Sequence, residues 1–167
     1  MNGDVWMTTY TEDFIKEMYK KIGIEKPKQL GFQNISGALG IKVYFWRNSS
    51  QALFIGSQAF IALNENLTVS QQWQEFCHEL SHVLQHNGHQ GYRGKMPRSW
   101  IEYQENKANN FMYHACIPSF MLDTLKINDY TFSTVIMIQR LFNVEYEFAL
   151  SRVTQYINNR MQLYCCS

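Results

Sequence analysis

Residues 71–88, QQWQEFCHELSHVLQHNG, decide how the fold of this chain is interpreted. Apolar side chains recur there every three or four residues, and this period predicts an amphipathic helix with one face in the core. Ser70 precedes the stretch as a good N-cap, and Gly88 is a suitable helix end. The stretch also contains the sequence HExxH, so we predict one long helix that carries the two histidines and the glutamate of this motif.

The HExxH spacing suits a metal ion. Positions i and i+4 of a helix differ by about 40° in azimuth and about 6 Å in height, so His78 and His82 can point at one cation. Glu79 lies about 100° round the helix, where it can reach a water molecule on the metal but is not a natural ligand. Zinc lowers the pKa of such a water towards about 7, and a carboxylate can then take its proton. We therefore predict a metal site with Glu79 as general base.

A catalytic zinc ion needs a third protein ligand and one open position. A second helix is expected over residues 98–116, and it supplies Glu102 and Glu105 three residues apart. Because this spacing turns both side chains to similar faces, it does not choose between them. His86 would need a strained helix to reach the same ion, and His89 lies beyond the expected helix end.

The residues before the HExxH helix change to a strand pattern. IKVYFW (41–46), ALFIG (52–56) and AFIALN (59–64) are rich in β-branched and aromatic residues and predict three strands. Tight connections between them predict an antiparallel meander, with the HExxH helix covering one face. Helices are expected over 10–22 and 34–39. The predicted fold class is α+β and zincin-like, with a small antiparallel three-stranded sheet packed on the HExxH helix.

The chain after Pro118 is predicted to be helical. Three helices are expected, at roughly 118–126, 130–142 and 145–161, and the last two suggest a helix-turn-helix shape. No internal repeat or linker is visible. We predict a single metallopeptidase domain over residues 1–167, with a zincin-like core to about residue 118 and a helical part over 119–167.

Composition excludes several classes of protein. Of 167 residues, 46% are hydrophobic, 15% aromatic and only 17% charged, which excludes a disordered chain. The net charge of +1 gives no strong field for nucleic acids or anionic membranes. The sequence contains no run of 18 apolar residues, so no membrane-spanning helix is expected. We therefore expect neither direct nucleic-acid binding nor a membrane partner.

The cysteines and the first residues indicate the compartment. The N-terminal segment carries acidic residues and no apolar core, so it is not expected to be a signal peptide. No pair of cysteines has CxxC spacing, which is typical of reduced thiols and predicts a cytoplasmic protein. The four are Cys77, Cys116, Cys165 and Cys166.

Two motifs together resemble the ImmA/IrrE family of metallopeptidases. HELSHVLQH (78–86) is similar to the family pattern HELGHxxLH, and ENKANNFMYHACIP (105–118) is similar to ExxANxFAxxLLxP. The resemblance covers roughly residues 30–155. Ser81 stands where the family usually has glycine, and Met112-Tyr113-His114 (112–114) replaces a smaller, alanine-rich stretch.

The resemblance implies a site and an activity. In its register Glu105, rather than Glu102, takes the place of the third ligand beside His78 and His82, with Glu79 as catalytic base and Zn²⁺ as cofactor. Family members are intracellular proteases of mobile elements, prophages and stress-response loci, and characterised ones cleave a helix-turn-helix repressor. The resemblance thus implies a zinc endopeptidase that relieves repression of a phage or mobile element. The candidates for stabilising the oxyanion are Tyr92, Arg93, Tyr103 and His114.

Other interpretations stay open. His114 lies about 180° round the helix from Glu105, so it is expected in the core or on the surface. The chain could instead bind and sequester a repressor without cleaving it, with a structural zinc ion, but Cys77 points away from His78 and a closed four-ligand site is not evident. A DNA-binding unit over 130–160 would have three arginines, Arg140, Arg152 and Arg160, offset by Glu145 and Glu147. The glycine-rich loop over 88–98 is either a gate for the cleft or a plain surface connection.

Overall fold

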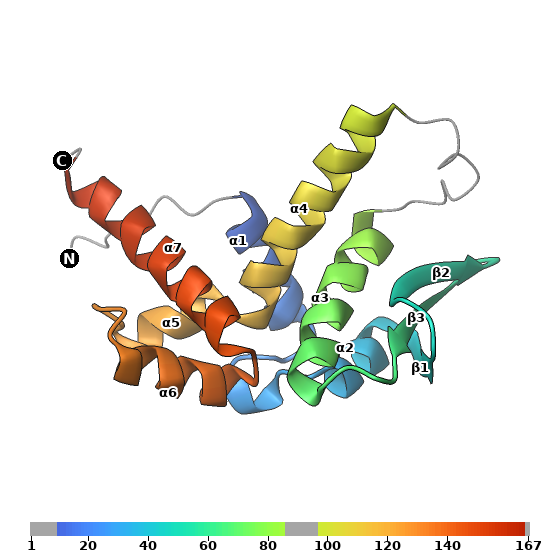
Figure 1. Cartoon of the computed structure of the whole chain (residues 1–167), viewed down its shortest axis with the longest axis horizontal. Helices are drawn as coiled ribbons and strands as arrows, with labels where there is room; N and C mark the ends of the chain where they lie inside the picture. The colour runs from blue at the N-terminus through green and yellow to red at the C-terminus, as the bar shows by residue number, and fades with distance from the viewer. Residues whose placement is uncertain (1–9, 86–96, 166–167) are drawn as a thin grey trace.

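The computed structural model describes residues 10–85 and 97–165. Gly88, Cys166 and the predicted loop up to residue 96 lie outside the described residues. The elements confirm the α+β class (Figure 1). In chain order they are α1 (Tyr10–Lys21), the 3₁₀ turn η1 (Pro27–Gln29), α2 (Phe32–Leu39), β1 (Lys42–Trp46), β2 (Gln51–Ile55), β3 (Gln58–Asn64), α3 (Val69–Gln85), α4 (Arg98–Cys116), α5 (Ser119–Leu125), α6 (Phe132–Phe142) and α7 (Tyr146–Cys165).

Gly23 ends α1 in a conformation that glycine favours. It has φ +75°, and its N–H donates to the carbonyl of Lys20 at 3.2 Å. The next residue, Ile24, donates to the carbonyl of Tyr19 at 2.8 Å and is itself buried. These two bonds are those of a Schellman motif, which satisfies the last carbonyls of a helix and returns the chain to the core.

The sheet is mixed rather than antiparallel, so the predicted meander is wrong. Its order is β1-β3-β2, with β2 antiparallel to β3 and β1 parallel to β3. The strands β2 and β3 form the expected hairpin. The link from β1 to β2, however, crosses the end of β3 instead of joining neighbouring strands.

The short link over 47–50 is long enough for this crossing. Two strand spacings are roughly 10 Å, and a chain step covers about 3.3 Å. Hydrogen bonds hold the crossing in place. The backbone N–H of Asn64 donates to Ser50 Oγ at 3.1 Å, and the N–H of Glu65 donates to the carbonyl of Trp46 at 2.8 Å. The central place of β3 explains why Ile61, Ala62 and Leu63 are all fully buried.

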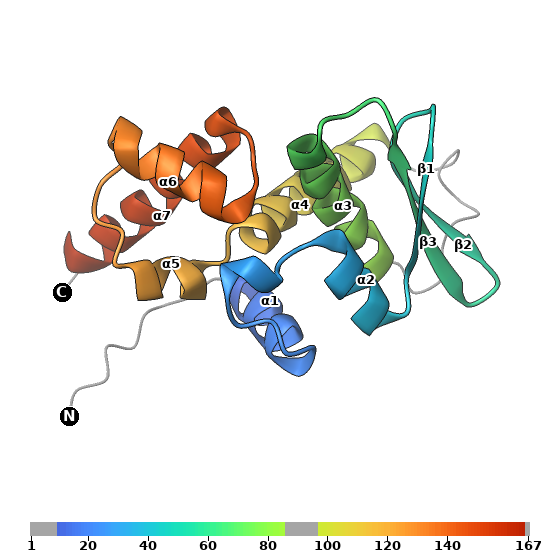
Figure 2. The same cartoon turned by 90° about the horizontal axis from the view of Figure 1, so that it is seen from below.

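Helix α3 lies between the sheet and the rest of the chain. Its apolar residues Trp73, Phe76 and Leu80 are buried, as are Ile61 and Leu63 of β3. On its other side α3 packs along α4. Figure 2 shows the sheet and helices α5, α6 and α7 at opposite ends, with α3 and α4 between them. The HExxH helix is thus held by the sheet on one side and by α4 on the other.

The C-terminal helices join the core through α4 and α7. The rings of Tyr113 and Phe148 stack with centroids 4.4 Å apart. Arg152 is fully buried, and its Nε donates to the carbonyl of Ile117 at 3.1 Å while Nη2 donates to Ser119 Oγ at 2.6 Å. A buried arginine with these bonds ties α7 to the turn between α4 and α5.

Candidate metal centre

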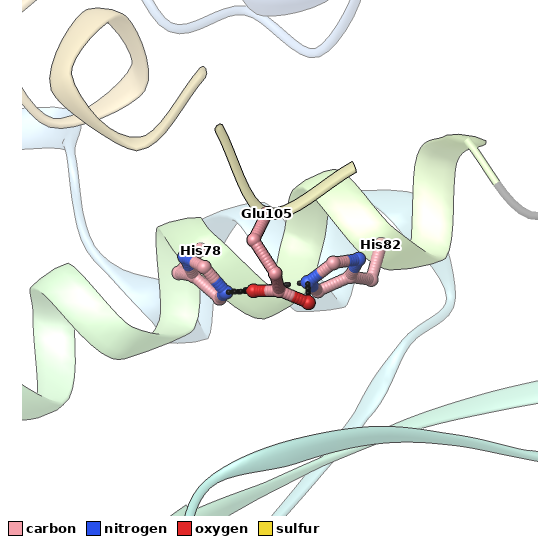
Figure 3. A group of neighbouring side chains, drawn as sticks. All are labelled: His78, His82 and Glu105. Carbon is pink, nitrogen blue, oxygen red and sulfur yellow. Dashed lines mark hydrogen bonds and ion pairs between the residues drawn. The ribbon is translucent and has the colours of Figure 1, made fainter. Parts of the chain in front are cut away.

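Three side chains from α3 and α4 converge on one point. His78 and His82 lie one turn apart on α3, and Glu105 reaches them from α4 (Figure 3). The Nε2 atom of His78 is 3.2 Å from Glu105 Oε2 and 3.2 Å from His82 Nε2. The Nε2 atom of His82 is 3.6 Å from Glu105 Oε1. The structure therefore brings together all three residues that the family resemblance selected.

These separations suit a tetrahedral zinc ion. Ligand bonds of 2.0–2.1 Å at tetrahedral angles place neighbouring ligand atoms about 3.3 Å apart. The two imidazole nitrogens are 3.2 Å apart, and the carboxylate approaches them at 3.2 Å through Oε2 and at 3.6 Å through Oε1, so all three distances are close to that value. Two imidazole nitrogens and one carboxylate are a donor set that zinc accepts at catalytic sites. The residues fit the metal, while their role as ligands stays a prediction.

The three side chains differ in their exposure to solvent. The side chain of His82 is 6% exposed and that of His78 is 15% exposed, whereas that of Glu105 is 44% exposed. An ion held by the three would thus have protein behind it and solvent on the side of Glu105. A metal ion held there would be accessible from solvent, as a catalytic site requires.

Glu79, the second residue of the HExxH motif, contacts the sheet. It is buried, and its Oε2 accepts a 2.6 Å hydrogen bond from the backbone N–H of Ala52. Ala52 lies on β2, which is an edge strand of the sheet. Among the described residues β2 pairs only with β3, and the carboxylate of Glu79 takes the place of a further strand as acceptor for this N–H. The predicted base is therefore held between the HExxH helix and a strand edge.

Asn109 supports one of the predicted ligands. Its Oδ1 is 3.0 Å from Nδ1 of His78, the ring nitrogen that faces away from Glu105. Asn109 lies four residues after Glu105 on α4, so the two side chains share a helix face. Helix α4 thereby contacts His78 at both ring nitrogens.

Several candidates lie elsewhere. Glu102 is on the exposed start of α4, where its Oε1 accepts from Arg98 Nε at 3.1 Å. Tyr103 lies about 200° round α4 from Glu105 and borders a hollow on the side of α1. His114 is buried in the core, with Nδ1 3.7 Å from Glu12 Oε1. His86, His89, Tyr92 and Arg93 lie outside the described residues.

Cys77 does not complete a four-ligand site. It is fully buried beside His78 in sequence, and burial raises the pKa of its thiol well above the usual value, with a hydrogen bond to Cys116 adding to the effect. A buried thiol with a raised pKa is a poor metal ligand. In the part of the chain that the structure describes, the only cluster of metal-ligating side chains is the His78, His82 and Glu105 group.

Two arginines of α7 are engaged within the protein. Arg152 is fully buried, and Arg160 pairs with Asp123 and covers the ring of Tyr156 at 4.5 Å. Phosphate contacts need exposed basic side chains. Two of the three arginines considered for DNA binding therefore do not present a basic face.

No helix in the described ranges combines the length and apolar character needed to cross a bilayer.

Two supports of the site were not predicted. The bond from Ala52 comes from a backbone N–H, so no side-chain pattern could reveal it. Asn109 had a signal, because it takes the asparagine place of the family pattern ExxANxF and lies four residues after Glu105, but the pattern does not say what the side chain contacts.

Most of the chain is similar to known proteins. A family model described as the IrrE N-terminal-like domain, a peptidase family, matches residues 36–154. The uncharacterized protein YqaB of Bacillus subtilis is 32% identical over 157 residues, which cover 94% of this chain and 90% of YqaB. The phage-like element PBSX protein XkdA of the same organism is 33% identical over 148 residues, which cover 89% of this chain and 73% of XkdA. The family match contains α3 and α4 entire.

Proposed function

The chain belongs to the IrrE N-terminal-like family of peptidases, and on that premise we propose that it is a zinc-dependent endopeptidase. Its proposed substrate is a partner protein, a helix-turn-helix transcriptional repressor of a phage or mobile element. Cleavage would inactivate the repressor and relieve repression. The observation that carries the activity is the convergence of His78, His82 and Glu105 with separations of 3.2 to 3.6 Å beside the buried Glu79.

Zinc is the proposed metal because two imidazoles and one carboxylate next to an HExxH glutamate suit it. The same donors also accept manganese or iron. When bound, zinc supplies Lewis acidity that lowers the pKa of water and polarises a carbonyl group.

The residues of the chain have two roles in the proposed reaction, metal binding and proton transfer. His78, His82 and Glu105 hold the ion, and the carboxylate of Glu79 takes a proton from the attacking water. Glu79 then delivers that proton to the nitrogen of the leaving amine. The hydrogen bond from Ala52 restrains Oε2 of Glu79, so the base does not have to be ordered at the moment of reaction.

The partner is proposed from the family and from one relative. XkdA is by its name a protein of a phage-like element, and the family resemblance implies a repressor of such an element. The engaged Arg152 and Arg160 favour a protein over DNA as the direct partner. Such a role would place the chain in the cytoplasm, where its target acts.

The test is co-expression of the chain with the helix-turn-helix repressor encoded beside its gene, followed by intact mass spectrometry of both proteins. We expect two repressor fragments with the native chain and none with Glu79→Gln. An intact repressor in a stable complex with both forms would instead identify a sequestering protein.

A further inference from the structure

We propose that Asn109 is a positioning residue that fixes the ring of His78 for metal binding. This inference rests on the proposed metal site, and it adds to that site a residue that never touches the ion. Its basis is the contact between Asn109 Oδ1 and His78 Nδ1 at 3.0 Å.

The position of the proton on the imidazole ring of His78 determines which atom donates in this hydrogen bond. A neutral imidazole that offers Nε2 to a metal must carry its proton on Nδ1. His78 Nε2 is the atom that faces Glu105 and His82, each at 3.2 Å. Nδ1–H therefore needs an acceptor on the far side of the ring, and the amide oxygen of Asn109 is in place to accept. The contact selects the tautomer that leaves Nε2 free to bind an ion.

The contact also fixes the orientation of the ring. Metal-bound histidines usually donate their second N–H to a carboxylate or a carbonyl oxygen, and loss of that acceptor costs about 10–100-fold in metal affinity. Helix α4 supplies both this acceptor and the third ligand, Glu105, four residues earlier. A shift of α4 along α3 would therefore move the acceptor of His78 and the carboxylate together.

The adjacent residue provides a matched control. Asn110 lies one position further on α4, where its Nδ2 is 3.4 Å from Thr11 Oγ1 of α1 and its side chain is exposed. It borders the hollow on the side of α1 rather than the ligands. Substitution at Asn109 and at Asn110 changes the same residue type on the same helix, but only the first removes the acceptor of His78.

The experiment measures the zinc dissociation constant by competition with a chromophoric chelator. The variants are Asn109→Leu, Asn109→Asp and Asn110→Leu, each checked for its thermal midpoint without metal. We expect zinc affinity to fall about 10–100-fold in Asn109→Leu. We expect affinity within about threefold of wild type in Asn110→Leu, and rescue in Asn109→Asp, because a carboxylate also accepts the Nδ1 proton.

A spectroscopic signature separates positioning from a general loss of structure. In the zinc-loaded wild type, ¹⁵N NMR of the histidine rings should show His78 with its proton on Nδ1, and this signal should weaken or exchange faster in Asn109→Leu. Zinc binding by Asn109→Leu within twofold of wild type, or equal losses at Asn109 and Asn110, would overturn the inference. If wild type itself binds no zinc, the proposed metal site fails instead, so the two failures are distinguishable.

Discussion

The carboxylate of Glu79 accepts a 2.6 Å hydrogen bond from the backbone N–H of Ala52, which joins the HExxH helix to the edge strand β2. This bond places the predicted general base between two elements that are themselves packed against each other. The base is therefore restrained by the sheet, while the three predicted ligands are set by α3 and α4. Base and ligands can be altered separately.

Glu79→Gln should abolish cleavage while zinc binding is retained. A glutamine side chain can still accept the N–H of Ala52, but it cannot take a proton from water, and general-base catalysis contributes about 10²–10⁴-fold. Zinc content by elemental mass spectrometry and repressor cleavage by intact mass would be measured on the same sample. Turnover near that of wild type would remove Glu79 from the mechanism.

Glu105→Ala should lose most of the bound zinc, because two histidines remain without the third donor. Glu102→Ala is the matched control on the same helix. Its side chain is 62% exposed and pairs with Arg98, so zinc content should not change. The measurement is the molar ratio of zinc to protein after dialysis. Unchanged zinc in Glu105→Ala would assign the third ligand to another residue.

Arg152→Met should destabilise the protein by about 3–5 kcal/mol, the cost of removing one partner from a buried polar network. The substitution removes the donor to the carbonyl of Ile117 and the positive charge that lies 3.9 Å from Oε1 of Glu12. Burial lowers the pKa of Arg152 to about 10, so the guanidinium is charged at neutral pH.

The control for this substitution is Arg140→Met, on the exposed face of α6, where a change within about 0.5 kcal/mol is expected. Urea unfolding at neutral pH measures both variants. The prediction of a single domain further requires one cooperative transition in the wild type. Equal stability of the two variants would show that α7 is not tied to the core through Arg152.

His114 should make the protein less stable in acid. Burial lowers the pKa of His114 to about 4, and the charge of Arg152 adds to this effect, while Glu12 opposes it. The unfolded chain has a histidine pKa near 6.5 and so binds more protons than the folded chain between about pH 4 and 6.5. The contribution of His114 to the free energy of unfolding is therefore fully present above about pH 6.5, and it is lost as the pH drops towards 4.

The check is urea unfolding of metal-free wild type and His114→Gln at pH 7 and at pH 4.5. Wild type should lose more stability on acidification than the variant does, by at most about 3 kcal/mol. Because the two proteins differ only at position 114, the contributions of all other groups cancel in the comparison. An identical loss in the two proteins would contradict the assignment.

The periodic parts of the fold were predictable from the sequence. The bounds of α4 agree with the predicted range of 98–116, because its ends are marked by Pro97 and Pro118. The HExxH helix was recognisable because its apolar period and its ligand spacing agree. Runs of β-branched and aromatic residues also located the three strands. The pairing of β1 with β3 was not accessible, because strand composition does not identify the neighbour of a strand.

The site residues that belong to a motif with fixed spacing were predictable from the sequence. Residues whose role depends on burial in the tertiary structure were not. His78, His82 and Glu79 follow from one motif, and Glu105 followed only from the family resemblance. Arg152 was counted among solvent-facing bases because nothing local to it signals burial. Its partners lie on other elements, at Ile117 and Ser119, so only the tertiary structure reveals its role.

The proposal of zinc-dependent cleavage with Glu79 as base is tested most sharply by the intact mass of the purified repressor. The repressor is incubated with the metal-free chain, with the chain plus one equivalent of zinc, and with Glu79→Gln plus zinc. The account predicts two fragments, whose masses sum to the repressor plus one water molecule, in the second sample alone. An intact repressor in all three samples, or equal cleavage in all three, would contradict it.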